Sequence, residues 1–262
     1  MKPAFDFRLI HPDGPLGQNI QAIWSASVST NSEPITKPLF GDGSTGVLFN
    51  LNGNIVFDNE EYAEGIFWTP VKYQTEFITM PPGSRLVGFR FQPAIKPSML
   101  GPVGDALLIG QDQLYTQQAD LPLILSSVFE ELSVSKHHEL QIQTLQSWLA
   151  ENIEQTCFPP STLIQAISRI DPTSDVKEIE QTIPLSLRQL ERQFKNWVGM
   201  SPKQYQRLIR VRAAIEIIKQ NPLINLADLA MEGGFSDQAH MTREFQQLAK
   251  MTPKQYQKTK QP

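Results

Sequence analysis

The chain has 262 residues, of which 40% are hydrophobic and 19% are charged. Because a domain typically holds about 100–200 residues, this length predicts two domains. No run of roughly 18 apolar residues occurs, which excludes a membrane-spanning helix, and residues 1–10 lack the pattern of a signal peptide. The one cysteine, Cys157, excludes an internal disulfide and a multi-cysteine zinc site. We therefore expect a protein of the reducing cytoplasm.

The net charge of −4 averages two unlike parts of the chain. Residues 161–262 hold 15 Lys and Arg against 10 Asp and Glu, whereas residues 1–160 hold 8 against 17. The first part also contains 14 of the 20 prolines and 12 of the 15 glycines. Such an asymmetry indicates a basic module that meets a polyanion. We predict a first domain at 1–154, a linker at 155–160 and a second domain at 161–262.

Short apolar runs separated by turn residues predict a β-rich N-terminal domain. The runs 47–51, 65–68 and 86–91 have the composition of strands, and Asn52-Gly53 and Pro81-Pro82-Gly83 are breaks between them. Four aromatic residues of this region could line an apolar pocket, but we expect them to pack in the core. They are Trp24, Phe49, Phe67 and Trp68.

Two helices are predicted after Pro122, at residues 123–132 and 140–153. They either pack on the β-rich part or pair with a second copy of the chain, and the sequence leaves both open. His137 and His138 are expected at the surface. The sequence shows no clustered metal ligands, nucleophile elbow, P-loop or HExxH motif, so no catalytic residue, metal site or cofactor is assigned and we do not expect an enzyme.

A repeat with an offset of 51 residues dominates the C-terminal part. Arg192, Phe194 and the run 200–206 recur as Arg243, Phe245 and the run 251–257, with eight identical positions. Two copies are too few for a solenoid, which needs at least about three repeats. A pair of similar units is therefore the better interpretation.

Each copy has the pattern of two helices joined by a tight turn, which is the helix-turn-helix motif. In the second copy Gly233-Gly234 breaks the first helix, and Ser236 or Asp237 caps the next. Pro184 and Ser186 have these roles in the first copy.

One long helix, from the cap at Ser201 to Lys219, is predicted to join the two units. At 1.5 Å per residue it spans about 27 Å, so it can hold two recognition helices about one DNA turn, some 34 Å, apart.

The outer faces of the two recognition helices carry basic and amide side chains. Arg can bond two acceptors on guanine, and Gln can do the same with adenine. Any one of these residues could simply belong to a solvent-exposed helix face. Here, however, basic and amide side chains occur at equivalent positions in both copies of the repeat. The residues predicted to contact DNA bases are Arg188, Gln189, Glu191, Arg192, Lys195, Gln238, Ala239, His240, Thr242 and Arg243. Lys203, Arg207 and Lys254 are predicted to contact phosphates.

These motifs resemble the AraC/XylS family of transcription regulators. Residues 235–245 with Met251-Thr252-Pro253 are similar to that family's C-terminal signature, and residues 186–194 with 199–202 to its first recognition unit. The resemblance covers about 100 residues. It implies promoter binding beside RNA polymerase in the bacterial cytoplasm, in association with the nucleoid. The family's base-reading positions fall on Arg188, Glu191, Arg192, Gln238, Ala239, His240 and Arg243.

The chain departs from the family pattern at three positions. Glu180 replaces a small residue, Pro184 replaces the turn glycine, and Lys250 stands where the second copy often has glycine. An unpaired glutamate is costly to bury, so the first unit is expected to be more mobile or less specific than the second.

A weaker resemblance at residues 88–93 implies a cupin-like sensor domain before the DNA-binding domain. The predicted fold class is α+β, a β-rich cupin-like domain followed by an all-α domain with two helix-turn-helix units. The predicted function is sequence-specific regulation of transcription, with a small effector and a homodimer as open additions. The alternatives are a weakly specific architectural or partner-recruiting DNA-binding protein, and a DNA-repair methyltransferase, for which only Cys157 would be available.

Overall fold

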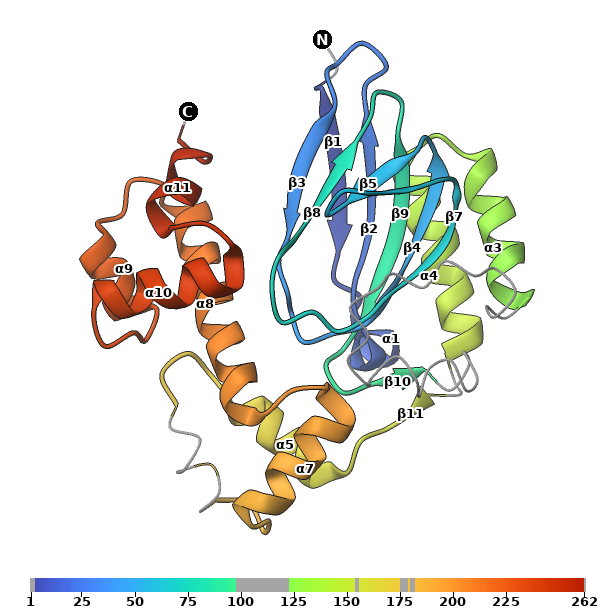
Figure 1. The fold of residues 1–262 in the computed structure, drawn as a ribbon. Helices are drawn as coiled ribbons and strands as arrows, with labels where there is room; N and C mark the ends of the chain where they lie inside the picture. The colour runs from blue at the N-terminus through green and yellow to red at the C-terminus, as the bar shows by residue number, and fades with distance from the viewer. Residues whose placement is uncertain (1–2, 98–122, 154–155, 175–178, 180–181, 262) are drawn as a thin grey trace. The chain divides into compact units, whose positions relative to one another are not determined.

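The computed structural model describes residues 3–97, 123–153, 156–174, 179 and 182–261 (Figure 1). The chain is α+β, as predicted, and it divides into a β-rich unit and a helical unit. The β-rich unit comprises Met1–Leu39, Ser44–Val71 and Glu76–Phe158. The helical unit comprises Pro159–Pro262 together with the short segments Phe40–Gly43 and Lys72–Thr75.

Two antiparallel sheets form most of the β-rich unit. The first has the strand order β1-β2-β9-β4-β7, with β1 at Phe5–Ile10, β2 at Ile20–Val28, β4 at Gly46–Asn52, β7 at Gly65–Thr69 and β9 at Arg85–Phe91. The second has the order β3-β8-β5-β6, with β3 at Ile35–Leu39, β5 at Ile55–Phe57, β6 at Glu60–Tyr62 and β8 at Glu76–Met80. The three predicted strands are confirmed as β4, β7 and β9.

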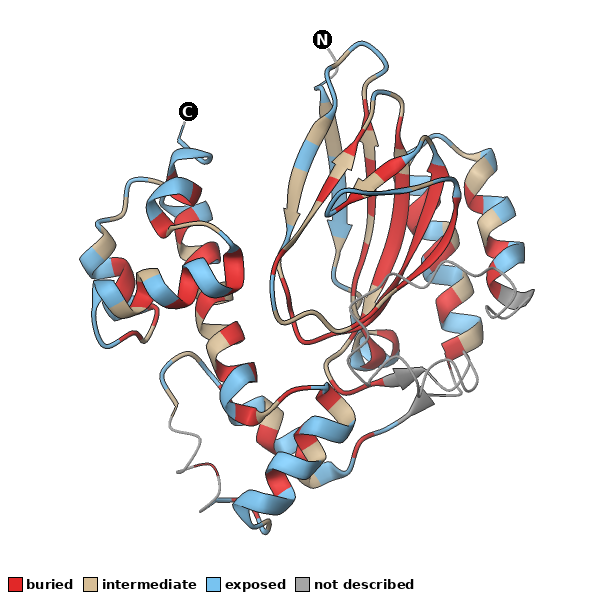
Figure 2. Cartoon of the chain, in the orientation of Figure 1, coloured by how far each residue is buried: buried red, intermediate tan, exposed pale blue. Residues whose placement is uncertain are grey.

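The inner strands β4 and β9 of the first sheet are buried on both faces, as their red colour shows (Figure 2). On β4, Phe49 points to a core shared with helices, whereas Leu48 points to a core shared with the second sheet. Burial on both sides explains why this strand reads as a continuous apolar run rather than an alternating one.

The four aromatic residues that were weighed as a pocket lie in two different cores. Phe49 and Trp68 belong to the helix side of the first sheet, and Phe67 belongs to the core between the sheets with Trp24 packed against it. Phe49, Phe67 and Trp68 are buried. The prediction of core packing is confirmed for these three residues, and the four side chains do not line one pocket.

The described part of the β-rich unit contains the helices α1 (Gly14–Asn19), α3 (Leu123–Val134) and α4 (His138–Asn152). The predicted helices are thus confirmed as α3 and α4. On one face of these two helices, Leu125, Leu132, Leu145 and Leu149 are fully buried in the core on the first sheet. This face of the two helices therefore packs on the sheet and does not pair with a second copy of the chain.

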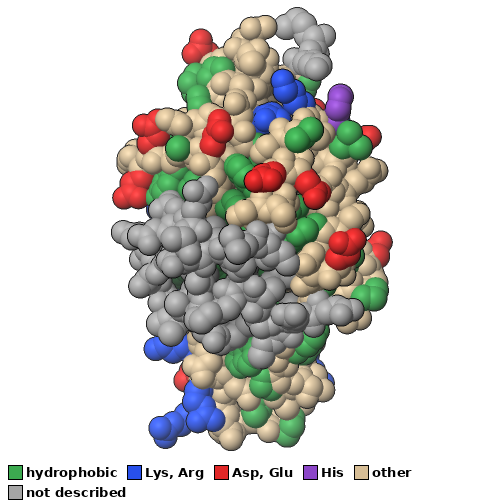
Figure 3. Space-filling model, turned by 90° about the vertical axis from the view of Figure 1, so that its right-hand side faces the viewer, with side chains coloured by type: hydrophobic (Ala, Val, Ile, Leu, Met, Phe, Trp, Pro, Cys, Tyr) green, Lys and Arg blue, Asp and Glu red, His purple; other side chains and the backbone are tan. Residues whose placement is uncertain are grey.

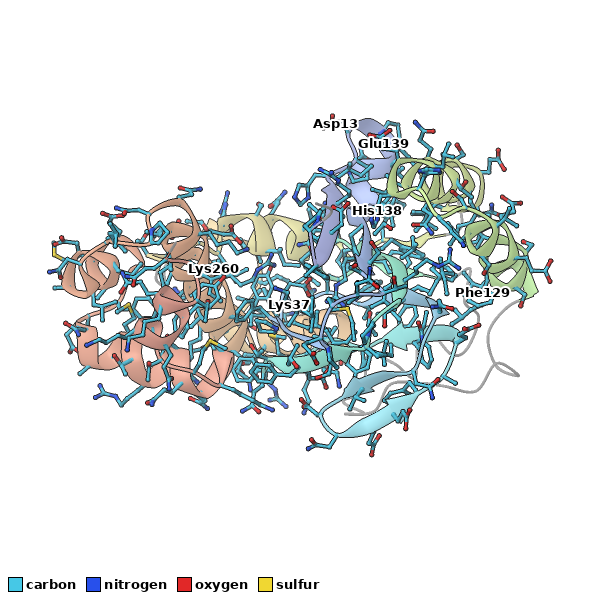
Figure 4. The ribbon with its side chains drawn as sticks, turned by 90° about the horizontal axis from the view of Figure 1, so that it is seen from above. Asp13, Lys37, Phe129, His138, Glu139 and Lys260 are labelled. Atoms are coloured by element: carbon cyan, nitrogen blue, oxygen red, sulfur yellow. The ribbon has the colours of Figure 1, made fainter. Side chains whose placement is uncertain are left out.

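The sequence expectation for His138 was wrong, because this side chain is half-buried at the start of α4 (Figure 4). Its Nδ1 lies 2.7 Å from Ser25 Oγ, and its Nε2 lies 3.0 Å from Ser27 Oγ and 3.6 Å from Asp6 Oδ2. Burial lowers the pKa of His138, and the Asp6 carboxylate opposes this shift. Ser25 is fully buried and bonded to Gln141, so the group ties α4 to the first two strands rather than presenting a nucleophile.

The predicted linker at 155–160 contains a short strand. There β11 (Thr156–Cys157) pairs antiparallel with β10 (Lys96–Pro97). Carboxylates are spread over the upper part of the face drawn in Figure 3, in keeping with the acidic composition of residues 1–160. Among the residues that the structure describes, no helix combines the length and apolar content that a membrane span requires.

The helical unit contains α5 (Ser161–Arg169), α7 (Leu187–Val198), α8 (Pro202–Gln220), α9 (Leu226–Glu232), α10 (Gln238–Ala249) and α11 (Pro253–Lys258). The predicted long connecting helix is confirmed as α8, with 19 residues. The first helix of the first helix-turn-helix unit, with Glu180, lies outside the described residues except for a few positions such as the buried Ile179.

Candidate nucleic-acid interface

The repeat in the sequence is also a repeat of backbone geometry. We call α7 and α10 the reading helices. Each begins at a residue whose side chain accepts a backbone N–H of the first turn, Ser186 for α7 and Asp237 for α10. Each ends at a left-handed residue, Gly199 with φ of 79° and Lys250 with φ of 54°. All four positions obey the offset of 51, so the two reading helices have the same length and the same ends.

The helix that follows each reading helix begins with the same capping box. Ser201 and Gln204 exchange side chain-to-backbone hydrogen bonds at the start of α8, and Thr252 and Gln255 do so at the start of α11. A proline occupies the first turn in both helices, where its missing N–H has no helical partner to lose. These bonds explain why the repeated run contains Ser or Thr, then Pro, then Gln.

The repeated aromatic residues join each reading helix to the helix after it. The ring centroids of Phe194 and Tyr205 lie 5.9 Å apart, and those of Phe245 and Tyr256 lie 6.1 Å apart. All four side chains are buried. Each pair therefore anchors the inner face of one reading helix and leaves its outer face to solvent.

The repeated glutamines fix the chain that precedes each unit. The buried Gln206 donates from Nε2 to the backbone oxygen of Ser174, and the buried Gln257 donates to that of Ile224 at 2.7 Å. A buried amide must find partners, so these bonds account for the last identical position of the repeat.

The outer face of α7 gathers all of its predicted base contacts. Arg188, Gln189, Glu191, Arg192 and Lys195 are exposed, as the pale blue of this helix shows (Figure 2). Together with Ser186 they line an open hollow of about 540 Å³. On α10, Gln238, Ala239 and Arg243 are exposed, whereas His240 and Thr242 are half-buried.

Three of the predicted base contacts also have partners within the protein. Gln189 Oε1 accepts from the backbone N–H of its capping partner at 2.9 Å, and Thr242 Oγ1 donates to the backbone oxygen of Gln238 at 2.8 Å. His240 Nδ1 lies 3.1 Å from Ser236 Oγ, and Nε2 lies 3.3 Å from Glu244 Oε1. Any contact of these groups with a base has to share or break these bonds.

The three predicted phosphate contacts differ in their surroundings. Lys203 and Lys254 are exposed and occupy equivalent positions in the first turns of α8 and α11, where the positive end of the helix dipole also attracts anions. Arg207 is only partly exposed. Its Nε donates to Glu244 Oε1 at 2.7 Å and its Nη2 donates to Gln247 Oε1 at 2.6 Å.

The sequence analysis did not identify Glu244, which the structure shows to be a buried and ion-paired residue of this interface. It is 6% exposed although it lies on a reading helix next to the exposed Arg243. One signal was present in the sequence, because position 244 falls three residues after Met241 and four before Leu248, on the inward face. A carboxylate on that face requires a cationic partner, and the sequence did not say which.

Comparisons with known proteins agree with this geometry. Residues 181–259 match the family model described as a helix-turn-helix domain. The chain is 30% identical over 99 residues to the HTH-type transcriptional regulator MtrA of Neisseria gonorrhoeae, over 37% of this chain and 32% of that protein. It is 27% identical over 84 residues to an uncharacterized HTH-type transcriptional regulator of Haemophilus influenzae, over 32% of this chain and 28% of that protein.

The matched region thus spans about a third of the length of these curated relatives. Among solved structures, ToxT from Vibrio cholerae aligns with a TM-score of 0.46 at 12% identity, over 97% of this chain and 98% of that chain. The C-terminal part of this chain is a helix-turn-helix domain, as the repeat predicted.

Proposed function

We propose that this chain is a bacterial transcription regulator of the AraC/XylS type, which reads two consecutive major grooves of double-stranded DNA. The observation that carries the proposal is the pair of reading helices with equivalent caps, equivalent anchors and outward basic or amide side chains. The names of both curated relatives, HTH-type transcriptional regulators, support it. The connecting helix α8 has 19 residues, or about 28 Å at 1.5 Å per residue, which suits a separation of one DNA turn.

Each exposed side chain has a role in this proposal. The exposed arginines of the reading helices bond guanine, and Gln238 bonds adenine. Lys203 and Lys254 bind phosphates and set the register of the protein on the duplex. The full set of proposed base contacts is Arg188, Gln189, Glu191, Arg192, Lys195, Gln238, Ala239, His240, Thr242 and Arg243.

Selection of binding sites from random duplex DNA by the full-length protein tests the proposal. We expect an enriched site with two short conserved blocks, one for each reading helix, whose centres lie about 10 base pairs apart. Enrichment of a single block would show that only one unit reads sequence. Binding without any enriched sequence would contradict the proposal and favour a weakly specific architectural or partner-recruiting protein.

The β-rich unit has the role of sensor or partner-binding unit in this proposal. Residues 1–160 carry 8 Lys and Arg against 17 Asp and Glu, so this part is unsuited to a polyanion. A small effector acts only if it binds the DNA-competent state and the other state with different affinities. Isothermal titration of the full-length protein against candidate metabolites, with and without DNA, tests this. RNA polymerase at the promoter, in the bacterial cytoplasm, is the partner that such a regulator requires.

A further inference from the structure

A buried carboxylate lies beneath the second reading helix. The Glu244 side chain is 7% exposed, and three cationic or ionisable side chains surround it. Glu244 Oε1 lies 2.7 Å from Arg207 Nε and 3.3 Å from His240 Nε2, and Oε2 lies 3.5 Å from Arg210 Nη1. The desolvation of such a group is costly unless it is paired and hydrogen-bonded, and these contacts meet that need.

The contacts of Glu244 fix α10 against α8 in more than one direction. Arg207 and Arg210 lie three residues apart, so they are neighbours on one face of α8. One carboxylate that bonds both arginines limits how α10 can slide along α8 and how it can rotate about its own axis. Arg207 also donates to Gln247 Oε1, one turn further along α10, at 2.6 Å. Apolar side chains alone would give a non-directional contact, which fixes neither motion as tightly.

The same network reaches the segment that follows α5. Arg210 Nε donates to the backbone oxygen of Pro172 at 3.0 Å, and its guanidinium carbon lies 5.6 Å from the centre of the Phe235 ring. Gly234, in the turn before α10, has φ of 72°, and an added Cβ there would stand 2.4 Å from the Pro172 oxygen. The turn of the second unit thus lies directly against the segment between α5 and the first unit.

The position of the first unit that is equivalent to Glu244 does not hold a carboxylate. The residue 51 positions before Glu244 is Gln193, a neutral amide. Within the part of the chain that the structure describes, its buried Oε1 has no hydrogen-bond partner. Among the described residues, the charged network around Glu244 thus joins the second unit to α8 and to residue 172, and Gln193 has no counterpart of it.

We propose that Glu244 is a positioning residue that, through Arg207 and Arg210, sets the rotation and spacing of the second reading helix relative to the first. The protein then distinguishes DNA sites by the distance between their two half-sites, as well as by base sequence. This inference rests on the proposed function. The buried Glu244 acts through the two arginines and not on a base, whereas the exposed Arg243 beside it is the proposed base contact.

The experiment uses the duplex that the wild-type protein selects, together with versions in which one base pair is added or removed between the half-sites. Each base pair shifts the second half-site by about 3.4 Å and roughly 35°. We expect the wild-type protein to bind these spacing variants about 10–100-fold more weakly, since one reading helix loses its base contacts. We call the affinity for the selected duplex divided by the affinity for a spacing variant the spacing ratio. E244Q keeps the side-chain shape but removes the charge, so it should reduce the spacing ratio to within about threefold.

Two further variants make the result specific. K203A is the matched control, because it removes an exposed phosphate contact outside the Glu244 network and should weaken binding to all three duplexes by a similar factor, so that the wild-type spacing ratio remains. R210K keeps a positive charge but cannot bond Glu244 and the Pro172 oxygen together as Arg210 does, so it should lower the ratio as E244Q does. Thermal melts confirm that each variant is folded, and R210K decides the question if E244Q is unfolded.

The outcomes separate the two proposals. A wild-type protein that selects no two-block site overturns the proposed function and this inference with it. A wild-type protein that selects such a site, while E244Q and R210K lose affinity but keep the full spacing ratio, overturns the inference alone. Loss of the spacing ratio in these variants, and not in K203A, supports it.

Discussion

Arg207 and Lys203 lie one turn apart on α8, and they should respond differently to replacement by alanine. From sequence, both were expected to bind phosphate. The structure leaves Lys203 exposed but engages the Arg207 guanidinium with Glu244 at 2.7 Å and with Gln247 at 2.6 Å. We therefore expect Lys203→Ala to weaken DNA binding electrostatically, and Arg207→Ala to lower the stability of the helical unit.

The size of each effect follows from these contacts. Loss of one phosphate contact lowers the slope of log K against log salt by about 0.9, which amounts to roughly 3.5-fold in affinity over about 50 to 200 mM salt. Breaking a buried ion pair costs about 3–5 kcal/mol. Because Glu244 keeps Arg210 at 3.5 Å and His240 at 3.3 Å, we expect a smaller loss for Arg207→Ala, about 2 kcal/mol.

Two measurements on the same samples separate these effects. Binding to a fixed duplex across a salt series gives the slope, and a thermal melt gives the stability, with about 4–8 °C expected for each kcal/mol in a domain of this size. Lys203→Ala should change the slope and leave the melting temperature nearly unchanged. If instead Arg207→Ala lowers the slope by about one and melts like the wild type, Arg207 binds phosphate and its pairing with Glu244 does not hold the unit together.

The remaining predictions concern α10 and its ends. Arg243→Ala should cost about 1–3 kcal/mol of binding free energy at the selected site and relax the choice of one base pair. Competition with single-base variants of the duplex measures this change. Equal losses of affinity on all sequences would contradict a base-reading role for Arg243. Lys250→Gly should raise stability by about 1 kcal/mol, because Lys250 has φ of 54° where the equivalent Gly199 takes 79° without strain; a melting temperature that falls would contradict this. The backbone N–H of His240, bonded to the Asp237 carboxylate, holds the pKa of Asp237 below its ordinary value of 3.8. The charged cap should therefore stabilise α10 fully above about pH 4 and lose this effect as the pH falls, and Asp237→Asn, which keeps the capping oxygen, should flatten that part of a pH series of melts.

The sequence by itself determined the features that depend on near neighbours in the chain. The capping boxes bond residues three positions apart, and the inward spacing of residues 241, 245 and 248 marks one face of a helix. The offset of 51 made the capping boxes of α8 and α11 and the inward face of each reading helix appear twice. Both reading helices, α9 and the connecting helix could therefore be predicted to within a few residues, and the outward positions of each reading helix followed from its inward ones.

The β-rich unit was only partly predictable. The strands with continuous apolar runs, β4, β7 and β9, stood out because they are buried on both sides or in the centre of a sheet. The exposed edge strand β1, with its mixed sequence and the exposed Phe7 and Leu9, has no comparable signal. Strand pairing joins distant segments, such as β2 with β9, and no local pattern specifies which strands meet.

Only the tertiary structure decided which charged and polar groups meet one another. Arg207 and Glu244 are 37 residues apart, and Ser25 and His138 are 113 apart. A cap or a helical face is set by bonds within one turn, whereas these pairs depend on where the chain returns after several elements. For that reason Arg207 could be taken for a phosphate contact and His138 for a surface residue until the fold placed a carboxylate beside the first and two serines beside the second.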